Sequence, residues 1–122
     1  MAQRKKLVIV NSRGPDDERS SVAWSIANTA AASEMDVTMF LVAAGADWAR
    51  KGAADAARPN PMDPPVADMM RSFLGNGGRI LVCPPCAKVR GYTADSLIVS
   101  ATLAGAPVML EEIANGAASL SF

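Results

Sequence analysis

The sequence predicts an α/β fold in which a mainly parallel sheet of about five strands lies between two layers of helices. Short runs of apolar and β-branched residues alternate along the chain with longer segments of helical periodicity. The chain has 122 residues, of which 50% are hydrophobic and 20% charged, as is typical of one globular domain. No repeat or low-complexity linker divides it, so we expect a single domain over residues 1–122.

The first element is a strand, since Leu7 to Val10 form an uninterrupted apolar run that ends in a turn at Asn11 to Pro15. Residues 16–32 are predicted to be helical, with acidic residues at the start and an apolar stripe of Val22, Ala23, Ile26, Ala27 and Ala30. Trp24 lies about 120° from the centre of that stripe. We therefore expect Trp24 to be partly exposed or packed against another subunit.

The second strand is expected at 36–42, and Gly45 begins a turn into a short alanine-rich helix that contains Trp48. Residues 56–65 hold four prolines and are predicted to form a surface loop. Asp63 and Pro64 suit the N-cap and first position of a helix whose apolar residues continue to Leu74. Gly75 ends that helix.

The third strand is predicted at 79–83, followed from Pro84 by a short helix that closes at Gly91. Residues 97–103 fit a strand or a helix equally well. A helix is expected at 107–115, with the adjacent Glu111 and Glu112 on a solvated face, and a last strand at 118–122.

Charge and composition exclude several classes of function. Lys and Arg number 12, as do Asp and Glu, so no net charge draws the chain to nucleic acid or an anionic membrane. The absence of histidine excludes a Ser-His-Asp triad, a Cys-His pair and histidine metal ligation. The apolar run after the basic N-terminus is too short for a signal peptide or membrane span. We expect a cytoplasmic protein without a metal or cofactor, and with no nucleic-acid or membrane partner.

Candidate site residues gather where strands end, because ligands of open parallel sheets bind outside the carboxyl ends of the strands. Three such ends carry notable chemistry, at Asn11 to Gly14, Ala43 to Asp47 and Cys83 to Cys86. Cys83 would be the N-cap of a helix, where backbone N–H groups are expected to lower its pKa and make it a nucleophile. Asn11, Arg13, Lys88 and Arg90 are the candidates for binding the substrate or its anion, although Arg90 equally suits a solvated helix end.

The C-x-x-C spacing of Cys83 and Cys86 has several interpretations. A zinc site needs two further ligands that the chain does not obviously supply. A thioredoxin-type redox pair has the right strand-to-helix context but lacks the expected hairpin with a cis-proline. Alternatively, the two cysteines are buried thiols that pack as small hydrophobic residues. Gly14 is followed by no phosphate-binding motif, so a plain turn is expected there.

The chain also resembles the DsrE/DsrF-like family, small α/β proteins of which several act in sulfur oxidation or in the sulfur relay for tRNA thiolation. The resemblance spans nearly the whole length: the first strand with Gly14 and Pro15, the strand at 36–41 followed by Gly45, the segment 82–91, and the closing residues 119–122. In the sulfur-relay members the working cysteine ends a strand eight residues before a glycine, which here matches Cys83 and Gly91. Cys86 matches a second cysteine found in some relatives.

The resemblance implies a DsrE-like, or flavodoxin-like, domain that carries sulfur as a cysteine persulfide and assembles as a trimer or hexamer. Our hypothesis is a sulfur carrier in which Cys83 exchanges sulfur with donor and acceptor proteins. A C-x-x-C thiol-disulfide protein and a non-catalytic oligomeric binding protein remain alternatives. We further expect a homotrimer that buries Trp24 or Trp48 between subunits. The 56–65 loop is expected near Cys83, either from the same chain or supplied by or packed on a neighbouring subunit. Alternatively, both tryptophans complete the core of one chain.

Overall fold

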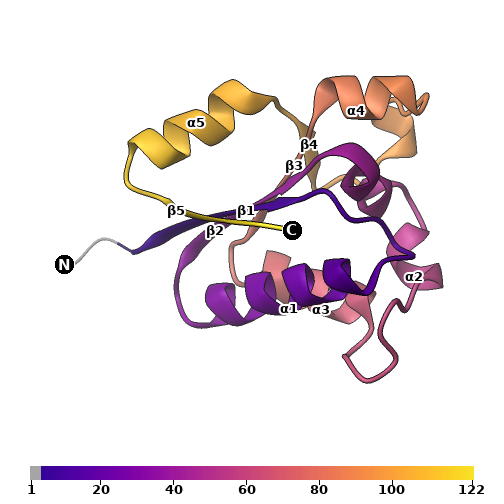
Figure 1. Ribbon diagram of the computed structural model, residues 1–122, viewed down its shortest axis with the longest axis horizontal. Coiled ribbons are helices and arrows are strands. Elements are labelled where there is room, and N and C mark those ends of the chain that lie inside the picture. Colours follow the sequence, from indigo (N-terminus) through magenta and orange to yellow (C-terminus); the bar gives the residue numbers. More distant parts are fainter. Residues whose placement is uncertain (1–3) are drawn as a thin grey trace.

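A computed structural model describes residues 4–122, and in that part of the chain five parallel strands form one sheet in the order β4-β3-β2-β1-β5 (Figure 1). Residues 1–3, the start of the N-terminal segment considered above, lie outside it. The strands are β1 (Lys6–Asn11), β2 (Asp36–Leu41), β3 (Arg79–Val82), β4 (Ala101–Leu103) and β5 (Ala118–Ser121). The ambiguous segment 97–103 thus ends in a strand.

Helices cover both faces of the sheet. In Figure 1, α1 (Glu18–Ala32) and α3 (Val66–Gly75) lie on one side, with α4 (Pro84–Val89) and α5 (Ala106–Ala114) on the other. The short elements are the 3₁₀ helices η1 (Ala43–Ala49) and η2 (Ala94–Ser96) and the helix α2 (Ala53–Ala56). The predicted three-layer α/β/α architecture is confirmed. Within residues 4–122, no helix combines the length and the apolar character needed to cross a bilayer.

The main core lies between the sheet and the α1/α3 layer. Alternate strand residues, Leu7 and Ile9 of β1 and Met39 and Leu41 of β2 among them, join α1 and α3 in one buried apolar cluster. The opposite face of the sheet buries Val8, Phe40 and Leu81. The helix α5, however, buries none of its own residues fully, so this second layer is the thinner one.

Both tryptophans belong to the core of the single chain. Trp24 and Trp48 are 0% exposed, and their rings meet edge to face with centroids 6.4 Å apart. Trp24 also packs edge-on against Phe73 of α3. The prediction that Trp24 is exposed or lies between subunits is wrong, because the buried face of α1 consists of small residues around Trp24, whereas Val22 points to solvent. The alternative, that both tryptophans complete the core, is confirmed.

The proline-rich loop is attached to α1. The helix α3 begins at Val66 rather than at Pro64. Pro65 has non-helical backbone angles, and helical angles are disfavoured at Pro64 because it precedes another proline. Asp63 is therefore not the N-cap; instead its carboxylate accepts a hydrogen bond from the Ser21 hydroxyl at 2.6 Å. Within one chain, this contact places the loop beside α1, in the layer opposite α4 (Figure 1), and not near Cys83 as expected.

Glu112 of α5 is not on a solvated face. Its carboxylate accepts hydrogen bonds from Arg79 at 2.9 Å and Lys6 at 3.2 Å, and only 16% of its side chain is exposed. These partners are the first residues of β3 and β1, and α5 packs over β1. The Arg79 guanidinium, together with Lys6, lowers the pKa of Glu112. Glu111, its neighbour, is exposed as predicted.

Candidate functional site

Cys83 lies between the end of β3 and the start of α4. Its N–H extends the ladder beyond β3 by donating to the carbonyl of Leu41 at 3.0 Å, and its own carbonyl accepts from the Ala87 N–H in α4. This confirms the predicted position at the end of a strand and at the N-cap of a helix. Cys83 and Cys86 are both free and part-exposed, and their sulfur atoms are 2.8 Å apart. The segment therefore presents two thiols that share a hydrogen bond.

The turn after β2 reaches this pair. The backbone N–H of Ala43 donates to the sulfur of Cys86 at 3.2 Å. Ala43 has a φ of 49°, in the left-handed region that residues other than glycine rarely adopt. Two residues on, a Cβ on Gly45 would lie only 2.0 Å from the carbonyl oxygen of Asn11, so this turn packs directly on the end of β1.

The pKa of Cys83 is raised, not lowered as the sequence led us to expect. Burial is the main cause, and the adjacent Cys86 side chain adds to it, while the backbone N–H of Cys86 acts in the opposite direction. The first two residues of α4, Pro84 and Pro85, have no N–H. The helix therefore lacks two of the donors that normally stabilise an anion at its N-terminus.

A polar network borders Cys86 on its other side. The hydroxyl of Tyr92 donates to Asp47 of η1 at 2.6 Å, and Arg90 forms an ion pair with the same carboxylate oxygen at 3.3 Å. Arg90 also donates to the backbone carbonyl of Cys86 at 3.2 Å. Burial, with the neighbouring Asp47, raises the pKa of Tyr92. The sequence pattern indicates Asp47 only as part of the strand end at 43–47, and it gives no signal for Tyr92, the one tyrosine of the sequence.

The predicted anion-binding residues are not all brought to the sulfur atoms. Arg90 is held beside Cys86 by the contacts just described. Lys88 is exposed and follows Cys86 by two residues, which turns it by about 200° to another face of α4. No contact between Lys88 and either thiol therefore supports the expected role of Lys88 in binding the anion.

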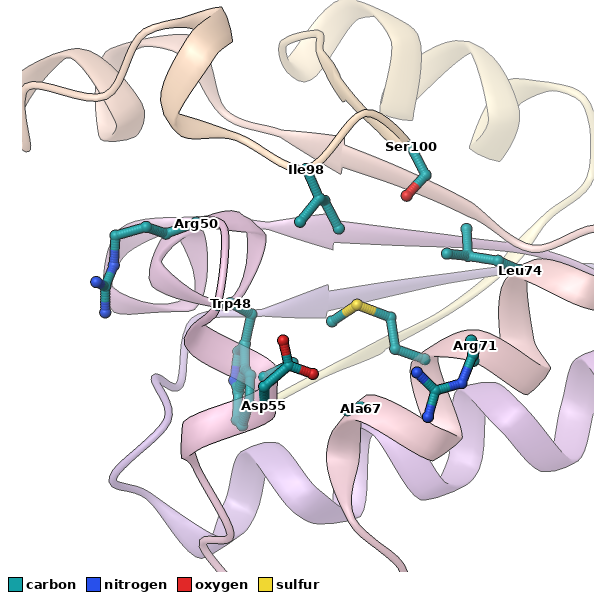
Figure 2. A pocket seen from close by; sticks show the side chains of 11 residues that line it. Trp48, Arg50, Asp55, Ala67, Arg71, Leu74, Ile98 and Ser100 are labelled. Carbon is teal, nitrogen blue, oxygen red and sulfur yellow. The ribbon is translucent and has the colours of Figure 1, made fainter.

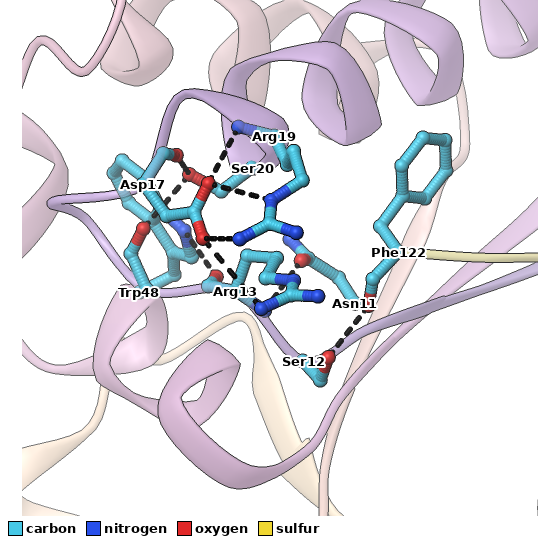
Figure 3. A network of polar contacts seen from close by, with 9 residues as sticks. Asn11, Ser12, Arg13, Asp17, Arg19, Ser20, Trp48 and Phe122 are labelled. Carbon is cyan, nitrogen blue, oxygen red and sulfur yellow. Dashed lines mark hydrogen bonds and ion pairs between the residues drawn. The ribbon is translucent and has the colours of Figure 1, made fainter.

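Asn11 is the last residue of β1, and Arg13 lies in the turn that leads to α1 (Figure 3). Asn11 is fully buried, and its side-chain oxygen accepts the N–H of Arg13 at 3.0 Å. The Arg13 carbonyl accepts from the Trp48 indole at 3.1 Å, and its guanidinium lies 3.7 Å from Asp17. The Gly14 carbonyl accepts from Ser20, consistent with the predicted plain turn. These contacts give Asn11 and Arg13 a role in joining β1, α1 and η1.

A cavity of about 170 Å³ opens elsewhere, between α2, α3 and residues 98–100 (Figure 2). Trp48, Met70, Leu74 and Ile98 form its apolar lining, and Asp55 and Arg71 stand at its rim. Neither cysteine lines it, so the thiols belong to a separate surface site at the strand ends. Among residues 4–122, no three acidic or cysteine side chains gather as metal ligands would.

Comparisons with known proteins agree with this architecture. The model of the DsrE/DsrF-like family matches residues 5–122. Two proteins of Methanocaldococcus jannaschii are similar in sequence: MJ0760 is 32% identical over 86% of this chain, and MJ0989 is 31% identical over 82%. The aligned region spans 38% of MJ0760 and 83% of MJ0989.

Solved structures show the same fold at low sequence identity. The ychN protein of E. coli superposes with a TM-score of 0.79 at 15% identity, covering 98% of this chain and all of that one. MTH1491 of Methanobacterium thermoautotrophicum gives 0.73 at 15% identity, with the same coverage. BT1422 of Bacteroides thetaiotaomicron gives 0.64 at 19% identity, covering 97% of this chain and 95% of that one.

Proposed function

Because the chain belongs to the DsrE/DsrF-like family, we propose that it is a cysteine-persulfide sulfur carrier in which Cys83 accepts and donates sulfane sulfur. The family supports a role related to sulfur relay in general. The observation that carries the finer proposal is the pair of free thiols 2.8 Å apart at the carboxyl end of β3. The resemblance to the relay members, in which a cysteine at the end of a strand carries sulfur, supports the choice of Cys83.

Loading begins with the thiolate of Cys83. It attacks the terminal sulfur of a donor persulfide, a bond forms between the two sulfur atoms, and the donor leaves as a thiolate. The raised pKa of Cys83 means that its proton must first be removed, but a thiol of higher pKa is also the stronger nucleophile once deprotonated. The proton of Cys83 leaves to solvent, because the Cys86 thiol is the donor in the hydrogen bond between the two sulfur atoms.

Unloading has two outcomes. An acceptor thiolate that attacks the outer sulfur takes it over, and Cys83 leaves as a thiolate. If Cys86 attacks the inner sulfur instead, hydrosulfide leaves and a Cys83–Cys86 disulfide remains, which a thiol reductant must then reduce. Cys86 thus acts as a resolving thiol in the second outcome.

The position of the thiols favours macromolecular partners. They lie on the rim at the strand ends and do not line the cavity between α2 and α3, so sulfur-donor and sulfur-acceptor proteins are the proposed partners, with further copies of the chain completing an oligomer. A cytoplasmic location fits this chemistry, because a reducing compartment keeps both thiols free.

Intact mass spectrometry after incubation with a persulfide donor tests the proposal. We expect the Cys86→Ser protein to gain the mass of one sulfur atom and the matched Cys83→Ser protein to gain none. Equal loading of both variants would contradict the assignment to Cys83.

The second candidate is a dithiol oxidoreductase, which the short distance between the sulfur atoms favours. It predicts reduction of a disulfide substrate that needs both cysteines, with no sulfur gained by either variant. A chain with neither property would be a non-catalytic binding protein.

A further inference from the structure

We infer that Asp47, Tyr92 and Arg90 are positioning residues that hold the Ala43 N–H against the sulfur of Cys86 and thereby set the reactivity of the thiol pair. The inference concerns the same cysteines and so rests on the proposed function for its biological meaning. Its physical content is a dependence of Cys86 on three side chains, none of which touches a sulfur atom in the contacts described above.

The contacts form a closed ring between η1 and α4. From the Cys86 carbonyl the ring runs through Arg90 to the carboxylate of Asp47, along η1 back to Ala43, and from its N–H to the Cys86 sulfur. Tyr92 braces this ring by donating to the same oxygen of Asp47 that faces Arg90. The ring therefore contacts Cys86 twice, at its carbonyl and at its sulfur. Any shift of η1 relative to α4 moves the Ala43 N–H relative to the sulfur.

The backbone of Ala43 depends on such support. Its φ of 49° is unfavourable for a residue with a side chain and persists only where surrounding contacts impose it. Gly45, packed on the Asn11 carbonyl, fixes the turn from the side of β1. Asp47 fixes it from the side of α4, so the two contacts together determine where the N–H points.

The electrostatic setting favours a lasting contact. The side chains of Asp47 and Arg90 are 33% and 29% exposed, so solvent and salt screen their ion pair less than they would a fully exposed one. Burial and Asp47 raise the pKa of Tyr92, which keeps its hydroxyl a neutral donor at physiological pH. The titratable and charged groups around Cys86 are thus Cys83 and Arg90 at the two ends of α4, Asp47 from η1 and Tyr92 after α4, with Arg50 acting on Tyr92.

The test isolates Cys86 in a Cys83→Ser background and follows its alkylation rate against pH. Loss of the Ala43 N–H contact makes the thiolate less favourable, so Tyr92→Phe and Asp47→Asn should shift the profile to higher pH and slow alkylation at neutral pH about three- to tenfold. Asp55→Asn makes the same charge change at an exposed position of α2 and should leave the rate unchanged.

The direction of the change separates positioning from simple electrostatics. Removing the negative charge of Asp47 would by itself favour the thiolate and speed alkylation, and Tyr92→Phe changes no charge at all. Slower alkylation in both variants supports the ring. Unchanged or faster alkylation in either folded variant overturns it.

A second readout needs no change at Asp47. In the Cys83→Ser protein, the amide proton of Ala43 should shift markedly downfield as Cys86 deprotonates, and this shift should shrink in Tyr92→Phe. An Ala43 amide that ignores the titration would overturn the inference. Because neither readout involves sulfur transfer, a chain that fails to load sulfur but passes both tests refutes the proposed function alone.

Discussion

Pro85 distinguishes Cys83 from a cysteine at an ordinary helix N-terminus, because it removes one N–H donor. An N-cap side chain accepts from the N–H groups of the second and third helical residues, which here are Pro85 and Cys86. Only Cys86 has that N–H, and its effect is outweighed by burial, which raises the pKa of Cys83. Burial is therefore the main cause of the raised pKa of Cys83, and the missing N–H of Pro85 leaves fewer donors to oppose it.

Restoring the missing donor should make Cys83 more reactive. In a Cys86→Ser background, we expect Pro85→Ala to lower the pKa of Cys83 and to speed its alkylation at neutral pH about threefold. Pro84→Ala is the matched control, because an N–H at the first helical position does not reach the N-cap side chain. Equal effects of the two substitutions would show that chain flexibility, not the donor, controls the thiol.

Gly45 should tolerate no side chain. Its Cβ would lie 2.0 Å from the Asn11 carbonyl oxygen, so Gly45→Ala must displace η1 or β1, and we expect it to lower the free energy of unfolding by about 2–4 kcal/mol. Gly75, at the end of α3, has open space around its Cβ position, and Gly75→Ala should raise stability by up to about 1 kcal/mol. Urea unfolding of both variants measures this contrast. A Gly45→Ala protein as stable as the parent would contradict the tight packing of η1 on β1.

At the scale of elements, the sequence predicts what local patterns encode. The strands β1, β2 and β3 follow from uninterrupted apolar runs, and the Cys83–Cys86 pair follows from its place at a strand end. The apolar stripe does not predict that Trp24 lies on the buried face of α1, because alanines contribute little to such a stripe. Their small size nevertheless lets the sheet and α3 pack around Trp24. Asp47 and Tyr92 could not be paired from the sequence, since 45 positions separate them and only the fold brings them together.

The attachment of α5 to the sheet should depend on pH through Glu112. Arg79 and Lys6 lower its pKa, so its contribution to stability is fully present above the unfolded value of about 4.5 and is lost as the pH falls through the lower folded value. We expect Glu112→Gln to cost about 1 kcal/mol of unfolding free energy at pH 7 and much less at pH 3.

Urea unfolding at the two pH values measures the effect of Glu112. The exposed Glu111 provides the control, because Glu111→Gln should change stability little at either pH. A deficit of Glu112→Gln that is the same at pH 3 and pH 7 would mean that packing, not charge, holds α5 in place.

At the scale of the whole molecule, the exposed apolar side chains suggest where copies of the chain meet. Both tryptophans are buried within one chain, so they cannot be the contact surface. Leu110 and Ile113 of α5 and Leu120 of β5 are exposed, and all the residues of β5, at the edge of the sheet, are exposed as well. We therefore expect the proposed homo-oligomer to use the α5/β5 side.

Light scattering at micromolar concentration should give the mass of a trimer or hexamer, and Leu110→Glu should reduce it. Met62→Glu, an equally drastic change at an exposed position of the proline-rich loop, should not. A parent protein that is monomeric at this concentration would contradict the oligomer, and a loss of assembly in Met62→Glu alone would place the contact on the other side of the molecule.

The fate of labelled sulfur tests the central claim most directly. The Cys86→Ser protein is loaded from a labelled persulfide donor, freed of donor, mixed with an acceptor thiol and followed by intact mass spectrometry. The account predicts that Cys83 carries one labelled sulfur atom, that this atom appears on the acceptor, and that the protein returns to its unloaded mass. No label on Cys83, or label that stays on Cys83 in the presence of acceptor, would contradict a sulfur carrier.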